Sequence, residues 1–128
     1  MNFNKLIPEL SVTNIEKSIK FYTSIGFKII YERKEDHFCF LELNGNQIMI
    51  EQINDNWNTG KLEYPFGRGI NISTTVDNIE NYYDNIKKLN YNIFKELKIS
   101  EYRVNDVIYE DKEFLIQDPD GYLLRFNN

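Results

Sequence analysis

The side chains that most often do chemistry in proteins are scarce in this sequence. Its 128 residues contain one histidine, His37, and one cysteine, Cys39. A single cysteine excludes an intramolecular disulfide and a cysteine cluster for zinc or iron–sulfur. A single histidine excludes, within one chain, a two-histidine metal site and a histidine pair for acid–base catalysis. The polar stretch around His37 predicts a solvated loop histidine, and strand alternation predicts that Cys39 is a small buried side chain.

Charge and hydropathy narrow the class of protein further. Twenty acidic and 15 basic residues give a formal net charge of −5. This balance argues against a nucleic-acid partner, which needs clustered lysine and arginine, and leaves room for a cationic ligand. The first twenty residues lack the pattern of a signal peptide, and no apolar stretch approaches the roughly 20 residues that span a bilayer. We therefore expect a cytoplasmic protein with no membrane partner.

An internal repeat organises the chain. Val12-Thr13-Asn14-Ile15-Glu16 recurs as Val76-Asp77-Asn78-Ile79-Glu80, an offset of 64 residues. Further along the offset becomes 74, which aligns Phe40-Leu41 with Phe114-Leu115. The second half therefore carries about ten extra residues, which we place within 98–112.

Each half has the same predicted order of elements. Leu6–Val12 alternates as a strand, and Asn14 is a good N-cap for the helical pattern that follows it. Gly26 stands where a helix commonly ends with positive φ. Asn44-Gly45-Asn46 is a hairpin signal between two further strands. Three short strands are expected after the helix, at Lys28–Glu32, Phe38–Leu43 and Gln47–Gln52.

The repeated unit is thus β-α-β-β-β, which predicts an α+β protein. We expect a single domain, 1–128, with module one at about 1–53 and module two at about 69–128. The segment at about 54–68 is the predicted linker between them.

Two stretches carry a resemblance to a known family. Pro8–Val12 runs into a helix that ends with Phe21-Tyr22, and Ile25-Gly26-Phe27 follows. The more specific stretch is Glu113–Phe126, with Asp118-Pro119-Asp120-Gly121 at its centre. Over essentially its whole length the chain resembles the vicinal-oxygen-chelate superfamily of glyoxalases, bleomycin-resistance proteins and extradiol dioxygenases. The resemblance implies an eight-stranded, incompletely closed mixed sheet around a cleft, and the bleomycin-resistance branch is the most similar.

Enzymes of this superfamily bind a metal at equivalent places in the two modules. Carried over by the repeat, these places are Ile7 and Asn71 in the first strands and Glu51 and Arg125 in the last strands. Isoleucine cannot bind a metal, and arginine is a permanent cation without a lone pair. We therefore predict no metal, no cofactor and no catalytic residue. The resemblance implies that Glu51 and Arg125 face the cleft from opposite halves, where they could form an ion pair.

Strand alternation and the aromatic residues suggest what lines the cleft. Aromatic residues make up 15% of this acidic chain. Such a composition suits a flat cationic ligand, which aromatic side chains bind through stacking and cation–π contacts. The alternatives are that the polar sheet face is simply solvated and that each aromatic residue fills a core or a loop. The predicted ligand-binding residues are Phe38, Phe40, Met49, Glu51, Trp57, Asn71, Ser73, Tyr102 and Arg125.

The resemblance implies a non-catalytic protein that confers antibiotic resistance by sequestering a bleomycin-type compound, free or as its metal complex. Family members form homodimers that hold ligands in clefts between subunits, so we expect a homodimer. One alternative is a glyoxalase- or dioxygenase-like enzyme, which would need metal ligands at Ile7 and Arg125. Another is a metal-free enzyme or a sensor of a different small molecule, because members of one fold diverge in ligand.

Overall fold

The computed structural model describes residues 2–128, which form two compact units. Unit 1 comprises the chain up to Phe66 together with Asp118–Gly121, and unit 2 comprises Gly67–Gln117 and Tyr122–Asn128. Most of the predicted linker thus belongs to unit 1. So does the short loop Asp118–Gly121, which follows the seventh strand.

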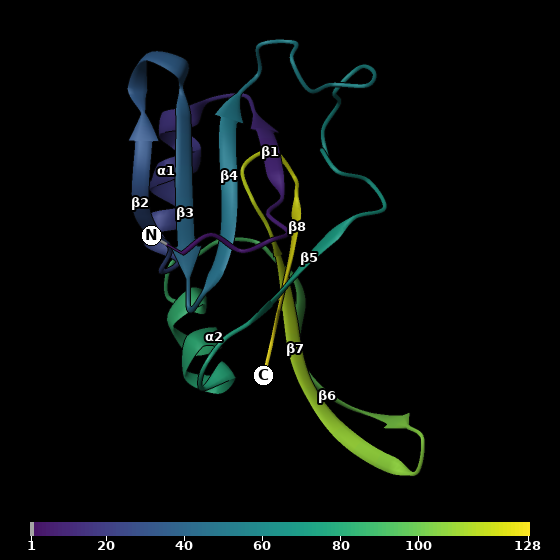
Figure 1. Cartoon of the computed structure of the whole chain (residues 1–128). Coiled ribbons are helices and arrows are strands. Elements are labelled where there is room, and N and C mark those ends of the chain that lie inside the picture. Colours follow the sequence, from purple (N-terminus) through teal and green to yellow (C-terminus); the bar gives the residue numbers. More distant parts are fainter. Residues whose placement is uncertain (1) are drawn as a thin grey trace. The chain divides into compact units, whose positions relative to one another are not determined.

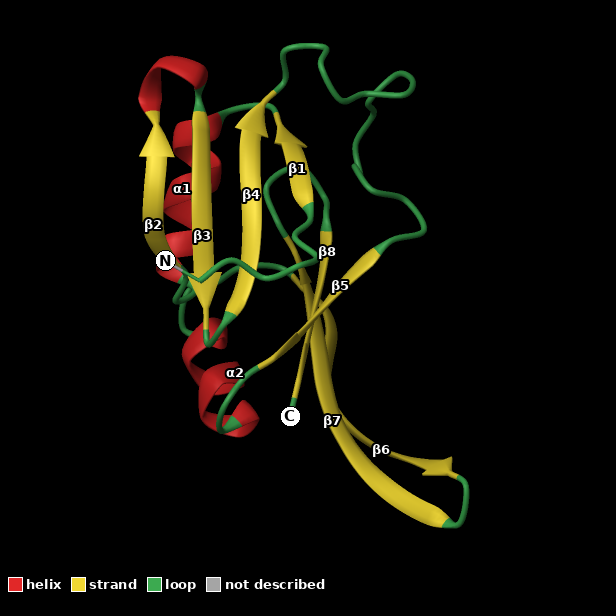
Figure 2. Ribbon diagram, viewed as in Figure 1, coloured by secondary structure: helices red, strands yellow, loops and turns green. Residues whose placement is uncertain are grey.

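Unit 1 contains one helix and a four-stranded mixed sheet (Figures 1 and 2). The strand order is β1-β4-β3-β2, in which β1 and β4 are parallel and the other neighbours are antiparallel. The elements are β1 (Glu9–Val12), α1 (Ile15–Ser24), β2 (Lys28–Arg33), the 3₁₀ turn η1 (Lys34–Asp36), β3 (Phe38–Leu43) and β4 (Asn46–Gln52).

Unit 2 repeats this arrangement with the order β5-β8-β7-β6, in which β5 and β8 are parallel. The prediction of an α+β fold with two tandem β-α-β-β-β modules is confirmed, and its eight strands are divided between two four-stranded sheets. The elements are β5 (Asn71–Thr75), α2 (Ile79–Lys87), β6 (Ile93–Val104), β7 (Val107–Gln117) and β8 (Leu123–Asn127).

Local sequence explains where the helices begin. The side chain of Asn14 accepts a hydrogen bond from the Lys17 backbone N–H, and Asn78 accepts one in the same way from Asn81. Each bond satisfies an amide that the first turn of a helix leaves without a partner. The two caps are 64 residues apart, as the sequence repeat requires.

Each helix covers one face of its own sheet. In unit 1 this face carries Leu10, Ile50 and Cys39 side by side, all buried. Burial raises the pKa of the Cys39 thiol to about 11, as expected for a small buried side chain rather than a reactive one. In unit 2 the ring of Tyr83 packs at 4.9 Å from that of Phe114.

The extra residues of module two form the far part of the β6–β7 hairpin. Lys98 pairs with Glu113, as Arg33 pairs with Phe38 in unit 1. Fourteen residues lie between Lys98 and Glu113 along the chain, and four lie between Arg33 and Phe38, which is a difference of ten. The insertion therefore lies within 98–112, as predicted, and lengthens two paired strands.

The strand register corrects the sequence alignment of the later strands. In unit 1 Glu9 lies beside Met49, and in unit 2 its counterpart Ser73 lies beside Arg125. The counterpart of Arg125 is thus Met49, an offset of 76, and the predicted match of Arg125 with Glu51 is wrong by two residues. In the same way Leu115, which pairs with Arg125, corresponds to Phe40.

No helix among residues 2–128 is long and apolar enough to cross a membrane.

Candidate functional site

The sheet of unit 1 has a polar face on the side away from α1. The register places Glu9 beside Met49 and Ser11 beside Glu51 on this side. We call this surface the Glu9–Glu51 face. It brings together four predicted ligand-binding residues, which are Phe38, Phe40, Met49 and Glu51.

Two carboxylates dominate the electrostatics of the Glu9–Glu51 face. Partial burial and the negative charge of Glu51 raise the pKa of Glu9. Two groups oppose this rise: the indole of Trp57, which is hydrogen-bonded to Glu9, and the positive charge of Arg33. Glu51 is 9% exposed and accepts a hydrogen bond from the Asn54 amide at 2.8 Å. The face is therefore an acidic surface bordered by an aromatic ring.

The two phenylalanines of this face are covered by other side chains of the same unit. The guanidinium of Arg33 lies 4.0 Å from the ring centre of Phe38. Tyr31 stacks on Phe40 at 5.3 Å, and Phe3 meets Phe40 edge-on at the same distance. Phe38 and Phe40 are consequently 3% and 1% exposed, so they support the face rather than present their rings to a ligand.

Trp57 is an aromatic residue beside this face that is more exposed than Phe3. It is 64% exposed, and its indole group is held at Glu9. Trp57 therefore lies beside the Glu9–Glu51 face, although it belongs to the irregular segment between β4 and β5.

Sequence reasoning did not select Glu9, Tyr31 or Arg33. Strand alternation alone places Glu9 on the same face as Ser11, and its negative charge on that face was a sequence signal for a residue that binds a cation. Tyr31 and Arg33 reach the face because they pair with Phe40 and Phe38. That pairing depends on a β-bulge between Ile29 and Tyr31, which the sequence pattern does not reveal.

Unit 2 has a pocket on the corresponding face of its sheet, of about 560 Å³. We call it the Arg125 pocket. It contains three predicted residues, Ser73, Tyr102 and Arg125, whereas Asn71 lies outside its lining at the exposed start of β5. Its lining residues are Ser73, Thr75, Ser100, Tyr102, Asp111, Glu113, Arg125, Asn127 and Asn128.

The guanidinium of Arg125 is held inside its own sheet. Its Nε donates to Glu113 at 2.6 Å, and an Nη lies 3.8 Å from Asp111. Burial and the charge of Glu113 raise the pKa of Asp111. Arg125 thus has carboxylate partners in unit 2, and Glu51 has its amide partner in unit 1.

The rest of the Arg125 pocket is lined by neutral hydrogen-bonding groups. The amide of Asn127 donates to the Ser73 hydroxyl at 2.7 Å and accepts from the Thr75 hydroxyl at 2.8 Å. These bonds fix the side chains that face the pocket beside the two carboxylates.

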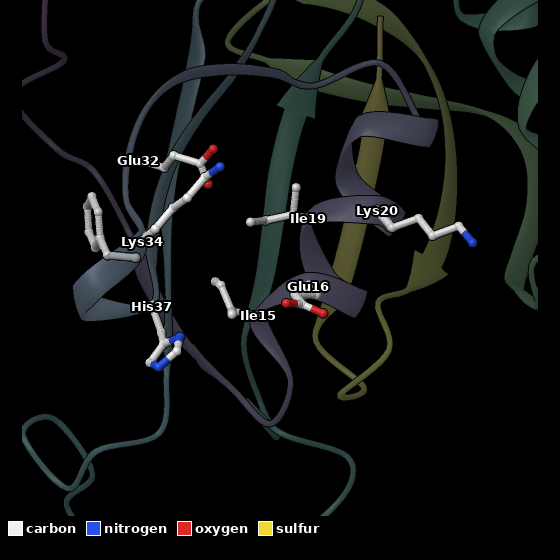
Figure 3. A pocket seen from close by; sticks show the side chains of 8 residues that line it. Ile15, Glu16, Ile19, Lys20, Glu32, Lys34 and His37 are labelled. Carbon is white, nitrogen blue, oxygen red and sulfur yellow. The ribbon is translucent and has the colours of Figure 1, made fainter.

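A second pocket, of about 460 Å³, lies on the helix side of the unit 1 sheet (Figure 3). We call it the His37 pocket. Ile15 and Ile19 of α1 form an apolar wall, and Figure 3 shows Glu32, Lys34 and His37 on the opposite side. None of the predicted ligand-binding residues except Phe38 lines it.

The metal positions of the superfamily do not fit a metal ion in this chain. With the corrected register the last-strand positions are either Met49 and Arg125 or Glu51 and Asn127. Together with Ile7 and Asn71, either set offers no imidazole and at most one carboxylate, which is too few for a divalent metal. Within residues 2–128, no three His, Cys, Asp or Glu side chains gather closely enough to hold a metal.

The tandem modules, each with an exposed polar sheet face, define the class as a βαβββ-repeat protein of the glyoxalase fold. The chain belongs to the Glyoxalase/Bleomycin resistance protein/Dioxygenase superfamily, whose family model matches residues 6–126. A search of curated proteins found no match.

Similar chains occur among the solved structures. A superfamily member from Vibrio splendidus 12B01 is 33% identical over 93% of both chains, with a TM-score of 0.43. A glyoxalase/bleomycin resistance protein/dioxygenase from Alicyclobacillus acidocaldarius is 22% identical, covers 97% of this chain and 89% of its own, and has a TM-score of 0.68. TioX from Micromonospora sp. ML1 is 12% identical over 98% of both chains, with a TM-score of 0.76, and shares the fold.

Proposed function

We propose that this protein is a non-catalytic, cytoplasmic binding protein of the bleomycin-resistance type. It sequesters a flat, cationic, aromatic compound of the bleomycin class, free or as its metal complex. The protein acts as a homodimer, and the ligand occupies a cleft at the dimer interface that includes the Glu9–Glu51 face.

One observation carries the proposal: two partly buried carboxylates lie beside an exposed indole. Burial and the nearby charge of Glu51 together raise the pKa of Glu9, so the negative charge of the face is only partly compensated. A cation placed there relieves the repulsion between them, and its aromatic part can stack on Trp57. The net charge of −5 favours the approach of a cationic ligand.

The direct test is a fluorescence titration with bleomycin, alone and as its copper complex. Trp57 is the only tryptophan of the chain and is 64% exposed, so a ligand on the face should quench its emission. Copper salt without bleomycin is the control for quenching by the metal alone. If neither the titration nor calorimetry detects binding, bleomycin is not the ligand.

Replacing Glu51 with glutamine should weaken bleomycin binding about tenfold, because one charge–charge contact with the cation is lost. The matched control is Glu16→Gln, which removes the same charge from an exposed position in α1, on the lining of the His37 pocket. Calorimetry on both variants measures the difference. A larger loss in Glu16→Gln than in Glu51→Gln would move the ligand to the His37 pocket and contradict the proposal.

The affinity for a cationic ligand should depend on pH through Glu9. Its pKa lies above that of an ordinary glutamate, so Glu9 takes up a proton at a higher pH than the exposed carboxylates do. A bound cation favours the charged form, so affinity should rise with pH through the pKa of Glu9 and fall below it. Titrations between about pH 4 and about pH 7 measure this dependence. Glu9→Gln should flatten the upper part of the profile, and an unchanged profile in that variant would exclude Glu9 from the site.

A further inference from the structure

The β6–β7 hairpin extends well beyond the sheet that it belongs to. Strand β8 pairs with β7 only along Glu113–Gln117, so 99–112 is a ribbon of two strands (Figures 1 and 2). Two-stranded ribbons are marginally stable in water without further packing. The twelve-residue strand β6 is also the outer strand of the sheet, and no other strand within residues 2–128 pairs with its free edge.

The ribbon exposes an unusual amount of apolar surface. Its side chains are arranged on both faces, with Tyr102 stacked on Tyr109 at 5.6 Å. A concentration of large apolar residues on a projecting element indicates an interaction surface. The residues concerned are between 46% and 65% exposed, and they are Ile99, Tyr102, Val104, Val107, Ile108 and Tyr109.

Charges along β6 indicate which partner fits. When two identical strands pair antiparallel about a twofold axis, the axis lies at one residue, which is then opposite its own copy in the other strand. The axis cannot lie between two residues, because directly opposed side chains would then point to opposite faces of the sheet. An axis through Tyr102 places Glu101 of each copy opposite Arg103 of the other. An axis one residue earlier opposes two Glu101 side chains, and one residue later opposes two Arg103 side chains. Of these three registers, only the one centred on Tyr102 places opposite charges next to each other, in two Glu101–Arg103 pairs.

We propose that a second copy of this chain docks on the β6 edge, antiparallel, with Tyr102 at the twofold axis. The pairing continues the sheet of unit 2 into the second copy and covers the two-stranded ribbon. The proposal rests on the homodimer of the proposed function alone, and it adds a contact between the β6 strands of unit 2 to the interface proposed there. Because Ser100 and Tyr102 also line the Arg125 pocket, the second copy borders that pocket.

The β7 edge of the same ribbon is a poorer match for a second copy. An axis through Glu110 or Asp111 opposes two carboxylates of like charge. Near the base of the ribbon, the Lys112 backbone N–H already donates to Asn128, and the Lys112 ammonium is paired with Glu80 at 2.6 Å. The β6 edge is therefore the one that favours self-association.

Charge reversal on the full-length protein tests the inference, with light scattering and sedimentation as measures of mass. Wild-type protein should be a dimer, and Arg103→Glu or Glu101→Arg alone should raise the dimer dissociation constant about tenfold or more, because each creates two repulsive contacts. The double variant Glu101→Arg/Arg103→Glu restores both opposite pairs and should return the constant to near the wild-type value. Lys17→Glu, the same change of charge on exposed α1, should have no effect.

Each outcome decides for or against this surface. A monomeric wild-type protein, single variants that dimerise as tightly as the wild type, or a double variant that is not restored would each overturn it. Circular dichroism should show that all variants are folded, since residues 101–110 are exposed throughout. Trp57 quenching by bleomycin is read on the same samples. The absence of quenching in a dimeric protein would overturn the ligand proposal and leave this one standing. Quenching of a monomeric wild-type protein would overturn this proposal and the homodimer of the proposed function, and would leave only ligand binding at the Glu9–Glu51 face.

Discussion

Replacing Asp118 with alanine should lower the free energy of unfolding by about 3 kcal/mol, or the melting temperature by about 10 °C. Asp118 is 3% exposed and belongs to unit 1. Its carboxylate accepts a hydrogen bond from the Tyr22 hydroxyl at 2.7 Å and another from the Asp120 backbone N–H at 2.9 Å. Alanine leaves both buried donors without this acceptor, and unsatisfied buried donors are costly.

The matched comparison is Tyr22→Phe, which removes one of these two bonds and keeps the carboxylate. We expect a loss of about 1–2 kcal/mol in that variant, and a double-mutant cycle should show coupling between the two sites. Asp84→Ala, at an exposed position in α2, should change stability by less than about 0.5 kcal/mol. Chemical denaturation measures all three. Equal effects of Asp118→Ala and Asp84→Ala would show that the buried bonds are not stabilising.

Replacing Gly121 with alanine should also cost about 3 kcal/mol of folding free energy, for two separate reasons. Its φ of +93° lies in the left-handed region, which is unfavourable for any side chain. A Cβ atom there would also lie 2.5 Å from the Cβ and 2.6 Å from the Cα of Pro65, which is too close for either to remain in place.

Gly45→Ala separates the two causes. Gly45 has a φ of +82°, but nothing lies within 4 Å of a Cβ at that position. This variant should lose only the conformational part, about 1 kcal/mol. Thermal unfolding of the two variants gives the difference. A cost at Gly121 no larger than that at Gly45 would show that the loop can move away from Pro65.

Both large effects fall within the motif that carried the family resemblance. Asp120 accepts two bonds from Thr13, from its backbone N–H at 3.2 Å and from its hydroxyl at 2.6 Å. The Phe66 backbone N–H donates to the Asp120 carbonyl at 2.8 Å. Asp118-Pro119-Asp120-Gly121 therefore identifies the fold because it is a structural loop. The proposed binding residues lie elsewhere, on the sheet faces and at Trp57.

The sequence alone was sufficient for everything that depends on local order. The repeat, the N-caps at Asn14 and Asn78, and the Asn44-Gly45 turn, whose φ values are +49° and +82°, are encoded within a few residues of where they act. The scarcity of histidine and cysteine likewise restricts metal chemistry, because composition alone sets which ligands the chain can offer. The fold class followed from these signals.

Only the tertiary structure decided which side chains meet on each face. The second module's β7–β8 turn and its β6 bulges change the register by two residues, which keeps Arg125 on the same face of its sheet but gives it a different counterpart. That is why Arg125 corresponds to Met49 and not to Glu51. Long-range packing likewise places Phe3 over Phe40 and Trp57 at Glu9, because these pairs are distant in sequence and no local pattern records them.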